Sequence, residues 1–305
     1  MDRIHYQTIR ANGIDFRVAT AGTGPRLALC LHGFPESSYS WRYQMPLLAS
    51  LGYRVWAPDL RGYGGSSRPV GVAAYALENL EEDVASLIEA SGAKEVVLVG
   101  HDWGALIAWQ YAMFGRLPIS RLIIMNVPHP ALMEKGLRTR RQLMKSWYVF
   151  FFQLPWIPEW GLARKGCEAI GRAFSDMAVD KSRFPEEVLR VYRDAAAEPG
   201  ALTAMVNYYR ALLRGLRRIR RRGIVPIEIP TLVIWGEVDA ALGKELSYGT
   251  ENYVSHLTLR YLPNVSHWVQ QEAPETVNAM IEAWLLGRGV PYAPGANPSM
   301  INGGS

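Results

Sequence analysis

Five short apolar runs, each bounded by turn-forming residues, constrain the fold of this 305-residue chain more than any other feature. They occupy residues 27–31, 55–57, 96–99, 122–125 and 232–235. Continuous apolar runs of this length are typical of strands that are covered on both faces. Patterns with helical periodicity lie between the runs, so the sequence predicts an α/β fold with a mostly parallel sheet flanked by helices.

The alternation of strands and helices stops between residues 130 and 224. This segment contains an aromatic stretch at 147–160 and two amphipathic stretches, at 185–197 and 200–215. Helices inserted between two strands predict a cap over the carboxyl edge of the sheet, where open α/β sheets bind ligands. We therefore divide the chain into three parts. They are a core of residues 1–129 and 225–290, a helical cap of residues 130–224, and a tail of residues 291–305 that we expect to be disordered.

Composition and charge narrow the possible partners. The net charge is +5, and the excess is concentrated in the sequence RALLRGLRRIRRRG at 210–223. No nucleic-acid motif accompanies this run, so it is interpreted as a solvated helix face. No apolar run approaches the roughly 20 residues of a membrane span. We expect a cytoplasmic monomer or homodimer without nucleic-acid or membrane partners. We also expect no metal or cofactor, because His101 and His129 lack the spacing of metal ligands.

The sequence GHDWG at 100–104 predicts a strand–turn–helix elbow. Gly100 and Gly104 allow a sharp turn between the apolar run that ends at Val99 and a helical pattern that begins near residue 104. Such an elbow holds the residue at its tip above the sheet, and that residue is usually a serine nucleophile. Here it is Asp102. An aspartate before a helix is often only an N-cap, but its position after a buried strand favours a nucleophile.

Two further polar residues follow later strands in the order nucleophile, acid, histidine. Asp239 follows the strand in TLVIWGEVDA, and His267 follows the strand in LTLRYLPNVSHW. Each residue alone is weak evidence, because polar residues are common in turns. Together with Asp102 they predict a catalytic triad in which Asp239 orients His267. Glu237 is the alternative acid.

The segment HGFP at 32–35 follows the first of the five apolar runs and predicts a turn beside the elbow. We expect the main-chain N–H groups of Phe34 and Trp103 to form an oxyanion hole. His32, Pro35 and Trp103 are the candidate substrate contacts.

With these motifs, the chain resembles the soluble epoxide hydrolases of the α/β-hydrolase fold superfamily. The resemblance covers residues 5–287 and includes HGFPES (32–37), DLRGYGGS (59–66), GHDWG, NVPHP (126–130), WGEVD (235–239) and SHWVQQEAP (266–274). It implies an inserted cap with two tyrosines that donate protons to the epoxide oxygen, which map to Tyr148 and Tyr209. The helical period independently places Tyr209 on the apolar face of its helix and Tyr208 about 100° away. Ser266 departs from the family, which often has glycine before the histidine.

The resemblance implies that water converts a small hydrophobic epoxide to a vicinal diol. Asp102 would attack the ring and form an alkyl ester, which water activated by His267 would hydrolyse. A serine would instead form an ether with no hydrolytic exit, which explains why an aspartate is needed at the tip. Haloalkane dehalogenation uses the same ester and is the first alternative, since Trp103 also fits that family. A non-catalytic binding protein with a hydrolase fold is the second.

Overall fold

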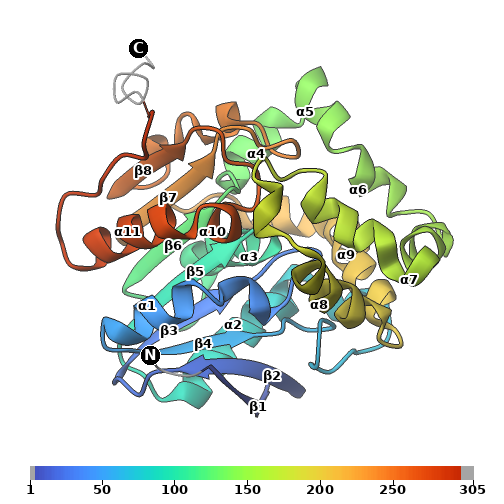
Figure 1. Ribbon diagram of the computed structural model, residues 1–305, viewed down its shortest axis with the longest axis horizontal. Coiled ribbons are helices and arrows are strands. Elements are labelled where there is room, and N and C mark those ends of the chain that lie inside the picture. Colours follow the sequence, from blue (N-terminus) through green and yellow to red (C-terminus); the bar gives the residue numbers. More distant parts are fainter. Residues whose placement is uncertain (1–3, 297–305) are drawn as a thin grey trace.

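The computed structural model describes residues 4–296, and its centre is an eight-stranded sheet with strand order β1-β2-β4-β3-β5-β6-β7-β8 (Figure 1). The strands are β1 (His5–Ala11), β2 (Ile14–Ala21), β3 (Arg26–Leu31), β4 (Tyr53–Pro58), β5 (Val96–His101), β6 (Arg121–Met125), β7 (Thr231–Gly236) and β8 (Leu257–Leu262). The pairs β1–β2 and β2–β4 are antiparallel, and every other neighbouring pair is parallel. The predicted fold class is confirmed.

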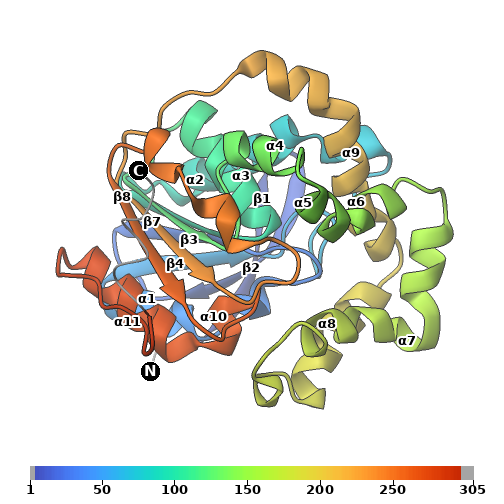
Figure 2. The same cartoon turned by 90° about the horizontal axis from the view of Figure 1, so that it is seen from above.

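Helices cover both faces of the sheet, as the continuous apolar runs predict (Figure 2). The core helices are α1 (Gln44–Ser50), α2 (Leu77–Ser91), α3 (Trp103–Phe114), α10 (Val269–Glu272) and α11 (Pro274–Leu285). Strand β3 shows the arrangement directly. Leu27, Leu29 and Leu31 belong to the apolar cluster that contains α2 and α3, whereas Ala28 and Cys30 belong to the cluster that contains α1 and α11.

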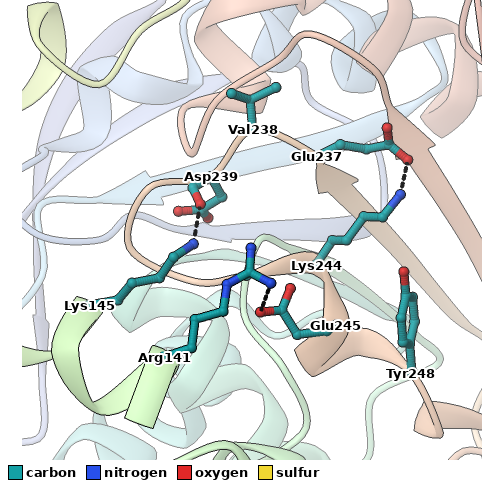
Figure 3. Close-up of a pocket in the computed structure, with 9 residues that line it drawn as sticks. Arg141, Lys145, Glu237, Val238, Asp239, Lys244, Glu245 and Tyr248 are labelled. Atoms are coloured by element: carbon teal, nitrogen blue, oxygen red, sulfur yellow. Dashed lines mark hydrogen bonds and ion pairs between the residues drawn. The ribbon is translucent and has the colours of Figure 1, made fainter. Parts of the chain in front are cut away.

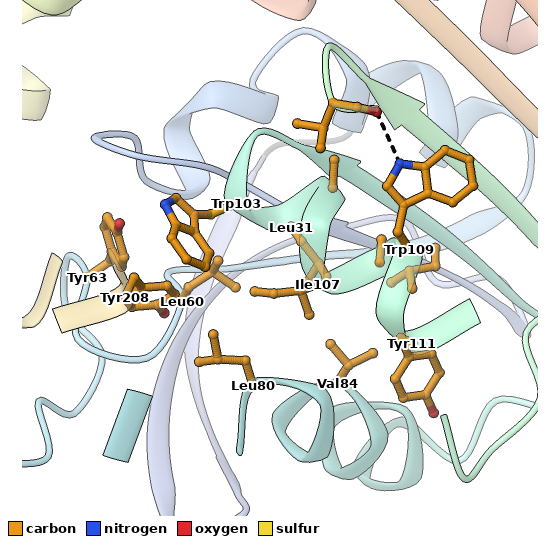
Figure 4. Packing of buried hydrophobic residues seen from close by; sticks show 14 of the residues in the cluster. Leu31, Leu60, Tyr63, Leu80, Val84, Trp103, Ile107, Trp109, Tyr111 and Tyr208 are labelled. Atoms are coloured by element: carbon orange, nitrogen blue, oxygen red, sulfur yellow. Dashed lines mark hydrogen bonds between the residues drawn. The ribbon is translucent and has the colours of Figure 1, made fainter. Parts of the chain in front are cut away.

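The cap is helical and is inserted between β6 and β7, over the carboxyl ends of the parallel strands. Its helices are α4 (Pro130–Gly136), α5 (Arg140–Lys145), α6 (Trp147–Phe151), α7 (Ile157–Ser175), α8 (Glu186–Ala197) and α9 (Ala201–Arg222). The cap shares one apolar cluster with the core. Figure 4 shows Tyr208 of α9 next to Tyr63 and Trp103 of the core, with ring centroids 5.3 and 5.2 Å from theirs.

The basic run at 210–223 is not wholly a solvated face, and this expectation needs correction at one end. Arg210 is buried, where its guanidinium pairs with Glu159 at 2.6 Å and donates to the carbonyl oxygens of Phe152 and Leu154. The helical period identifies a basic helix but not the cap segment that packs against it at Arg210. At the other end, Arg222 pairs with Glu81 of α2 at 2.6 Å.

The chain after α11 differs in part from the predicted disordered tail. Residues 291–296 have no regular secondary structure, but Ala293 is buried and the Arg260 guanidinium stacks on Tyr292 at 4.4 Å from the ring centre. These residues therefore pack on the sheet edge next to β8. The rest of the predicted tail, residues 297–305, lies outside the described residues.

Candidate active site

Asp102 occupies the tip of a sharp turn between β5 and α3. Its φ of 49° and ψ of −122° are unusual for a residue with a side chain, and such backbone conformations cluster at functional sites. Glycines on either side make this turn possible. A Cβ at Gly100 would overlap the main chain at Gly104 and Ala105, and a Cβ at Gly104 would overlap the carbonyl oxygen of Leu31.

The two oxygens of the Asp102 carboxylate have different surroundings. Oδ1 accepts a hydrogen bond of 2.6 Å from the main-chain N–H of Phe34, whereas Oδ2 lies 3.5 Å from Nε2 of His267. Burial by itself raises the pKa of Asp102, but the hydrogen bond and charge of His267, with the Phe34 amide, hold the pKa below its usual range. Asp102 is therefore ionised at neutral pH, with one oxygen held and the other available.

Asp239 and His267 lie beside Asp102, and they meet as the order of the motifs predicts. Nδ1 of His267 is 2.6 Å from Oδ2 of Asp239. The other carboxylate oxygen of Asp239 accepts from the N–H groups of Ala241 and Leu242, at 2.7 and 2.8 Å. Glu237, the alternative acid, instead forms a part-exposed ion pair of 2.7 Å with Lys244.

Two carboxylates control the charge of His267. Burial lowers the pKa of His267, but the negative charge of Asp239 and the hydrogen bonds to Asp102 and Asp239 outweigh burial and raise the pKa to about 10. The imidazole is therefore a cation at neutral pH as long as Asp102 carries its charge.

A cavity of about 390 Å³ lies between the core and the cap, above these three residues. Most of its lining is apolar or aromatic, and the ionisable groups come from the elbow, the histidine loop and the cap. The lining consists of Phe34, Pro35, Asp102, Lys145, Trp147, Tyr148, Phe151, Phe152, Leu162, Ala173, Met177, Tyr209, Ala240, Ala241, His267 and Trp268.

Tyr148 and Tyr209 both line this cavity, and their rings lie 5.8 Å apart in an edge-to-face arrangement. Burial raises the pKa of both hydroxyls, and the charge of Asp102 raises it further, so both remain protonated at neutral pH. Tyr208 has a different position. Its hydroxyl is buried in the core and donates to the carbonyl oxygen of Arg61 at 2.8 Å.

Two of the three predicted substrate contacts lie outside the cavity. His32 is fully buried below the turn, because Nε2 accepts from the N–H of Leu60 at 2.9 Å and Nδ1 lies 2.9 Å from the carbonyl oxygen of Gly33. The indole of Trp103 is buried against Tyr208 and Tyr209, with ring centroids 5.2 and 5.0 Å away. The third, Pro35, does line the cavity.

The two main-chain N–H groups predicted to form the oxyanion hole have different partners. Within residues 4–296, Phe34 donates to the Asp102 carboxylate and Trp103 does not. Trp103 is the first residue of α3, where N–H groups have no acceptor inside the helix. Its N–H is therefore available for a charge that develops only during a reaction.

A buried polar network that the sequence motifs do not predict lies behind the triad. Nδ1 of His101 lies 2.7 Å from the Glu36 carboxylate, and Nε2 of His101 lies 2.8 Å from the carbonyl oxygen of His267. Asn126 joins the other side, because its amide donates to Asp239 at 2.8 Å and accepts from the N–H of Gly236 at 3.0 Å. Glu36, His101 and Asn126 all lie in the quoted motifs, but the residues around them do not reveal their partners.

A second, charged cleft of about 560 Å³ adjoins the cavity (Figure 3). Figure 3 shows Lys145 next to Arg141, with the Lys145 ammonium group donating to the carbonyl oxygen of Asp239 at 2.9 Å. The cleft also contains the ion pairs Arg141–Glu245 and Lys244–Glu237. Lys145 lines both the cleft and the cavity.

Residues 4–296 contain no group of three or more His, Cys, Asp or Glu side chains placed to hold a metal ion. No helix among them is both long enough and apolar enough to cross a membrane.

Comparisons with known proteins agree with this geometry. The sequence pattern of the α/β-hydrolase fold family matches residues 28–274. Epoxide hydrolase 3 of Xenopus tropicalis is 38% identical over 92% of this chain and 77% of its own length. The AB hydrolase superfamily protein YfhM of Bacillus subtilis is 36% identical over 93% of this chain and 99% of its own length. The crystal structure of Bacillus megaterium epoxide hydrolase in complex with an inhibitor superimposes with a TM-score of 0.85 at 31% identity, covering 92% of this chain and 100% of that one.

Proposed function

The chain belongs to the α/β-hydrolase fold family and, within it, to the epoxide hydrolases, and from this premise we propose that it converts epoxides to vicinal diols through an ester on Asp102. The observation that carries the proposal is the asymmetry of the Asp102 carboxylate. One oxygen is held by a main-chain N–H, and the other lies 3.5 Å from His267, beside a cavity that two protonated tyrosines also line.

In the first step, Oδ2 of Asp102 attacks a carbon of the epoxide ring and the ring C–O bond breaks. Asp102 is already ionised, so this attack needs no general base. The ring oxygen leaves as an alkoxide and takes a proton from Tyr148 or Tyr209, while the second tyrosine stabilises it by a hydrogen bond. Acid assistance of this kind contributes roughly 10²–10⁴-fold to a rate.

In the second step, water attacks the ester carbonyl carbon. The ester has removed the negative charge of Asp102, so the pKa of His267 falls, and the imidazolium passes its proton to the tyrosinate left by the first step. Neutral His267 then takes a proton from the attacking water. The carbonyl oxygen becomes an oxyanion where the Phe34 N–H already donates, and the N–H of Trp103 supplies a second donor.

The ester then breaks and the enzyme is restored. His267 passes its proton to the leaving alkoxide, which completes the diol. The regenerated carboxylic acid of Asp102 gives the other water proton to His267, which restores the carboxylate and the imidazolium. The sum is one epoxide and one water consumed for one diol formed.

The cavity supports a class of substrate. Its volume of about 390 Å³ and its mainly aromatic walls favour a compact hydrophobic epoxide. Aryl and alkyl epoxides of the size of styrene oxide match this description, and they are the substrates with which we propose to begin.

The proposed ester predicts where the oxygen of water goes. In a single turnover of excess enzyme with styrene oxide in H₂¹⁸O, we expect an unlabelled diol and one ¹⁸O in the peptide that contains Asp102. Direct attack of water on the ring would instead label the diol and leave Asp102 unlabelled, which would overturn the ester mechanism.

Two variants and one second substrate complete the test. Asp102→Asn should abolish diol formation, and His267→Gln should accumulate an adduct on Asp102 whose added mass is that of the epoxide. Incubation with 1-bromobutane tests the dehalogenase alternative with the same enzyme. Bromide release without any diol from styrene oxide would reject the proposal in favour of dehalogenation.

A further inference from the structure

The outer edge of the cap exposes an unusual concentration of large hydrophobic side chains. Eight such side chains in residues 4–296 are at least half exposed, and six of them lie between residues 144 and 160. We call these six the cap-edge patch: Met144, Trp147, Phe150, Trp156, Ile157 and Trp160. Trp156 alone is 81% exposed. Single exposed hydrophobic residues need no explanation, but a cluster of this kind marks an interaction surface.

The cap-edge patch lies on consecutive elements at the rim of the molecule. Figure 1 shows α5, α6 and the start of α7 following one another along this edge. Trp147 belongs to the patch and also lines the active-site cavity, and Phe151, one turn later, lines the cavity from the same helix. The patch is therefore the outer side of the cavity wall.

Positive charge surrounds the cap-edge patch. Residues 134–168 contain seven lysines and arginines and three glutamates, so this segment carries a positive net charge of its own. One of the three, Glu159, is occupied by its ion pair with Arg210. The Arg164 guanidinium stacks on Trp160, 4.8 Å from the ring centre. Surface ion pairs engage some of these cations, in the pairs Arg138–Glu134, Arg141–Glu245 and Lys165–Glu168.

Exposed hydrophobic side chains surrounded by positive charge favour a lipid surface over a second copy of the chain as the binding partner. A second copy of the chain packed on the same patch would bring two basic surfaces together, which opposes association. An anionic lipid surface complements the charge. It also suits exposed tryptophans, whose amphipathic rings concentrate at the interface between lipid and water, and arginines, whose charged ends reach the headgroups.

We propose that the cap-edge patch docks this protein on the surface of anionic membranes. The apolar stretch Trp147–Phe152 is far too short to span a bilayer, so the sequence predicts no membrane partner. Interfacial binding needs no such span, since short helices with apolar and basic residues lie in the headgroup region. On the premise of the proposed function, docking places the cavity wall against the phase into which hydrophobic epoxides partition.

Vesicle sedimentation tests the docking without any turnover. Wild-type protein is mixed with sucrose-loaded vesicles of phosphatidylglycerol and phosphatidylcholine in equal parts, or of phosphatidylcholine alone, at low and high salt. We expect binding to the mixed vesicles that weakens with salt. Trp156→Ser/Trp160→Ser should lower the partition coefficient about tenfold or more. Arg140→Gln/Arg164→Gln should weaken binding to the mixed vesicles and reduce its salt dependence.

Matched controls make the outcome decisive. Val70→Ser removes another fully exposed hydrophobic side chain, outside the cap, and should bind like wild type. The proposal fails if wild type does not bind the mixed vesicles, or if the tryptophan variant binds as well as Val70→Ser. It also fails if sedimentation velocity finds a dimer that the tryptophan variant alone dissociates, because a second copy then covers the patch. Loss of diol formation with vesicle binding intact would count against the proposed function only.

Discussion

At the scale of single residues, the charge of Asp102 connects the two chemical steps. The Asp102 carboxylate helps to raise the pKa of His267 to about 10, and in the proposed mechanism its conversion to a neutral ester removes that contribution. On this proposal, His267 is a cation in the free enzyme and becomes a better base once the ester has formed. This alternation follows from two distances, 3.5 Å to Asp102 and 2.6 Å to Asp239.

The two steps should consequently differ in their dependence on pH. Ring opening needs ionised Asp102, whose pKa is held below its usual range, so ester formation should be nearly constant between about pH 6 and 9. Ester hydrolysis needs neutral His267, so its rate should fall as the pH drops below the pKa of His267 in the ester. Rapid-quench measurements of the adduct across this range test the difference. Parallel pH profiles for both steps would contradict it.

Neighbouring tyrosines provide a matched pair of substitutions. Tyr209→Phe removes a hydroxyl that lines the cavity and should slow ester formation by roughly 10²-fold. Tyr208→Phe removes the donor to the carbonyl oxygen of Arg61, which should lower the free energy of unfolding by about 1–2 kcal/mol. Stopped-flow kinetics and urea unfolding of both variants separate the two effects. Equal rates of ester formation in the two variants would remove Tyr209 from the chemistry.

At the scale of elements, the elbow depends on close contact between α3 and β3. Gly104→Ala would drive a methyl group into the carbonyl oxygen of Leu31, so we expect a loss of about 3 kcal/mol in stability and a displaced Asp102. Gly161→Ala makes the same change in α7, where a Cβ meets no atom within 4 Å, and should be neutral or stabilise the protein by up to about 1 kcal/mol. Thermal unfolding compares the two variants directly. A Gly104→Ala protein as stable as wild type would show that the elbow has room to relax.

The histidine loop and the cap are joined through α10. One oxygen of Glu272 accepts from the N–H groups of Val179 and Asp180 in the cap at 3.0 Å each, and the other accepts from the N–H and hydroxyl of Ser266. Ser266, which departs from the glycine common in the family, thus adds a hydroxyl donor to this link. The carboxylate fixes the segment before His267 and the cap at the same time.

Glu272→Gln should therefore loosen both sides of this link, because an amide offers one acceptor oxygen instead of two. We expect hydrogen exchange of the amides at 179–180 to accelerate about tenfold and kcat to fall. Glu275→Gln is the control, since Glu275 also reaches the cap, through Arg183, but as an exposed pair that contributes little. Similar exchange rates in the two variants would show that burial of Glu272 has no special effect.

Strands and candidate catalytic residues could be predicted from the sequence, whereas contacts between distant buried polar residues could not. Leu27–Leu31 is recognisable because every residue of a strand buried on both faces must be apolar. The triad is recognisable because each of its members follows its own strand. The contact between Glu36 and His101 is not recognisable, because the two residues are 65 positions apart and only the order of strands in the sheet brings them together. Arg210 is misjudged for a related reason, since helical periodicity does not identify what packs on a face.

At the scale of the whole molecule, cap and core form one packed body around the cavity. The ring of Tyr208 from α9 contacts Tyr63, Tyr75 and Trp103 of the core, with centroids 5.3, 5.5 and 5.2 Å away. Removing the cap would expose these rings together with the cavity wall. The chain leaves the sheet after Met125 of β6 and returns to it at Thr231 of β7, and we expect the cap between them to depend on the core for its stability.

A single cooperative unfolding transition follows from this packing. Peptides from α8 and from β5 should lose their protection from hydrogen exchange at the same urea concentration. Tyr208→Ala should lower both midpoints equally, with a loss of about 3–5 kcal/mol from the emptied volume. If the cap instead opens as a separate unit, α8 will lose protection at lower urea than β5, and Tyr208→Ala will widen the gap. Separate opening would mean that the cavity, which needs both walls, exists only while the cap is docked.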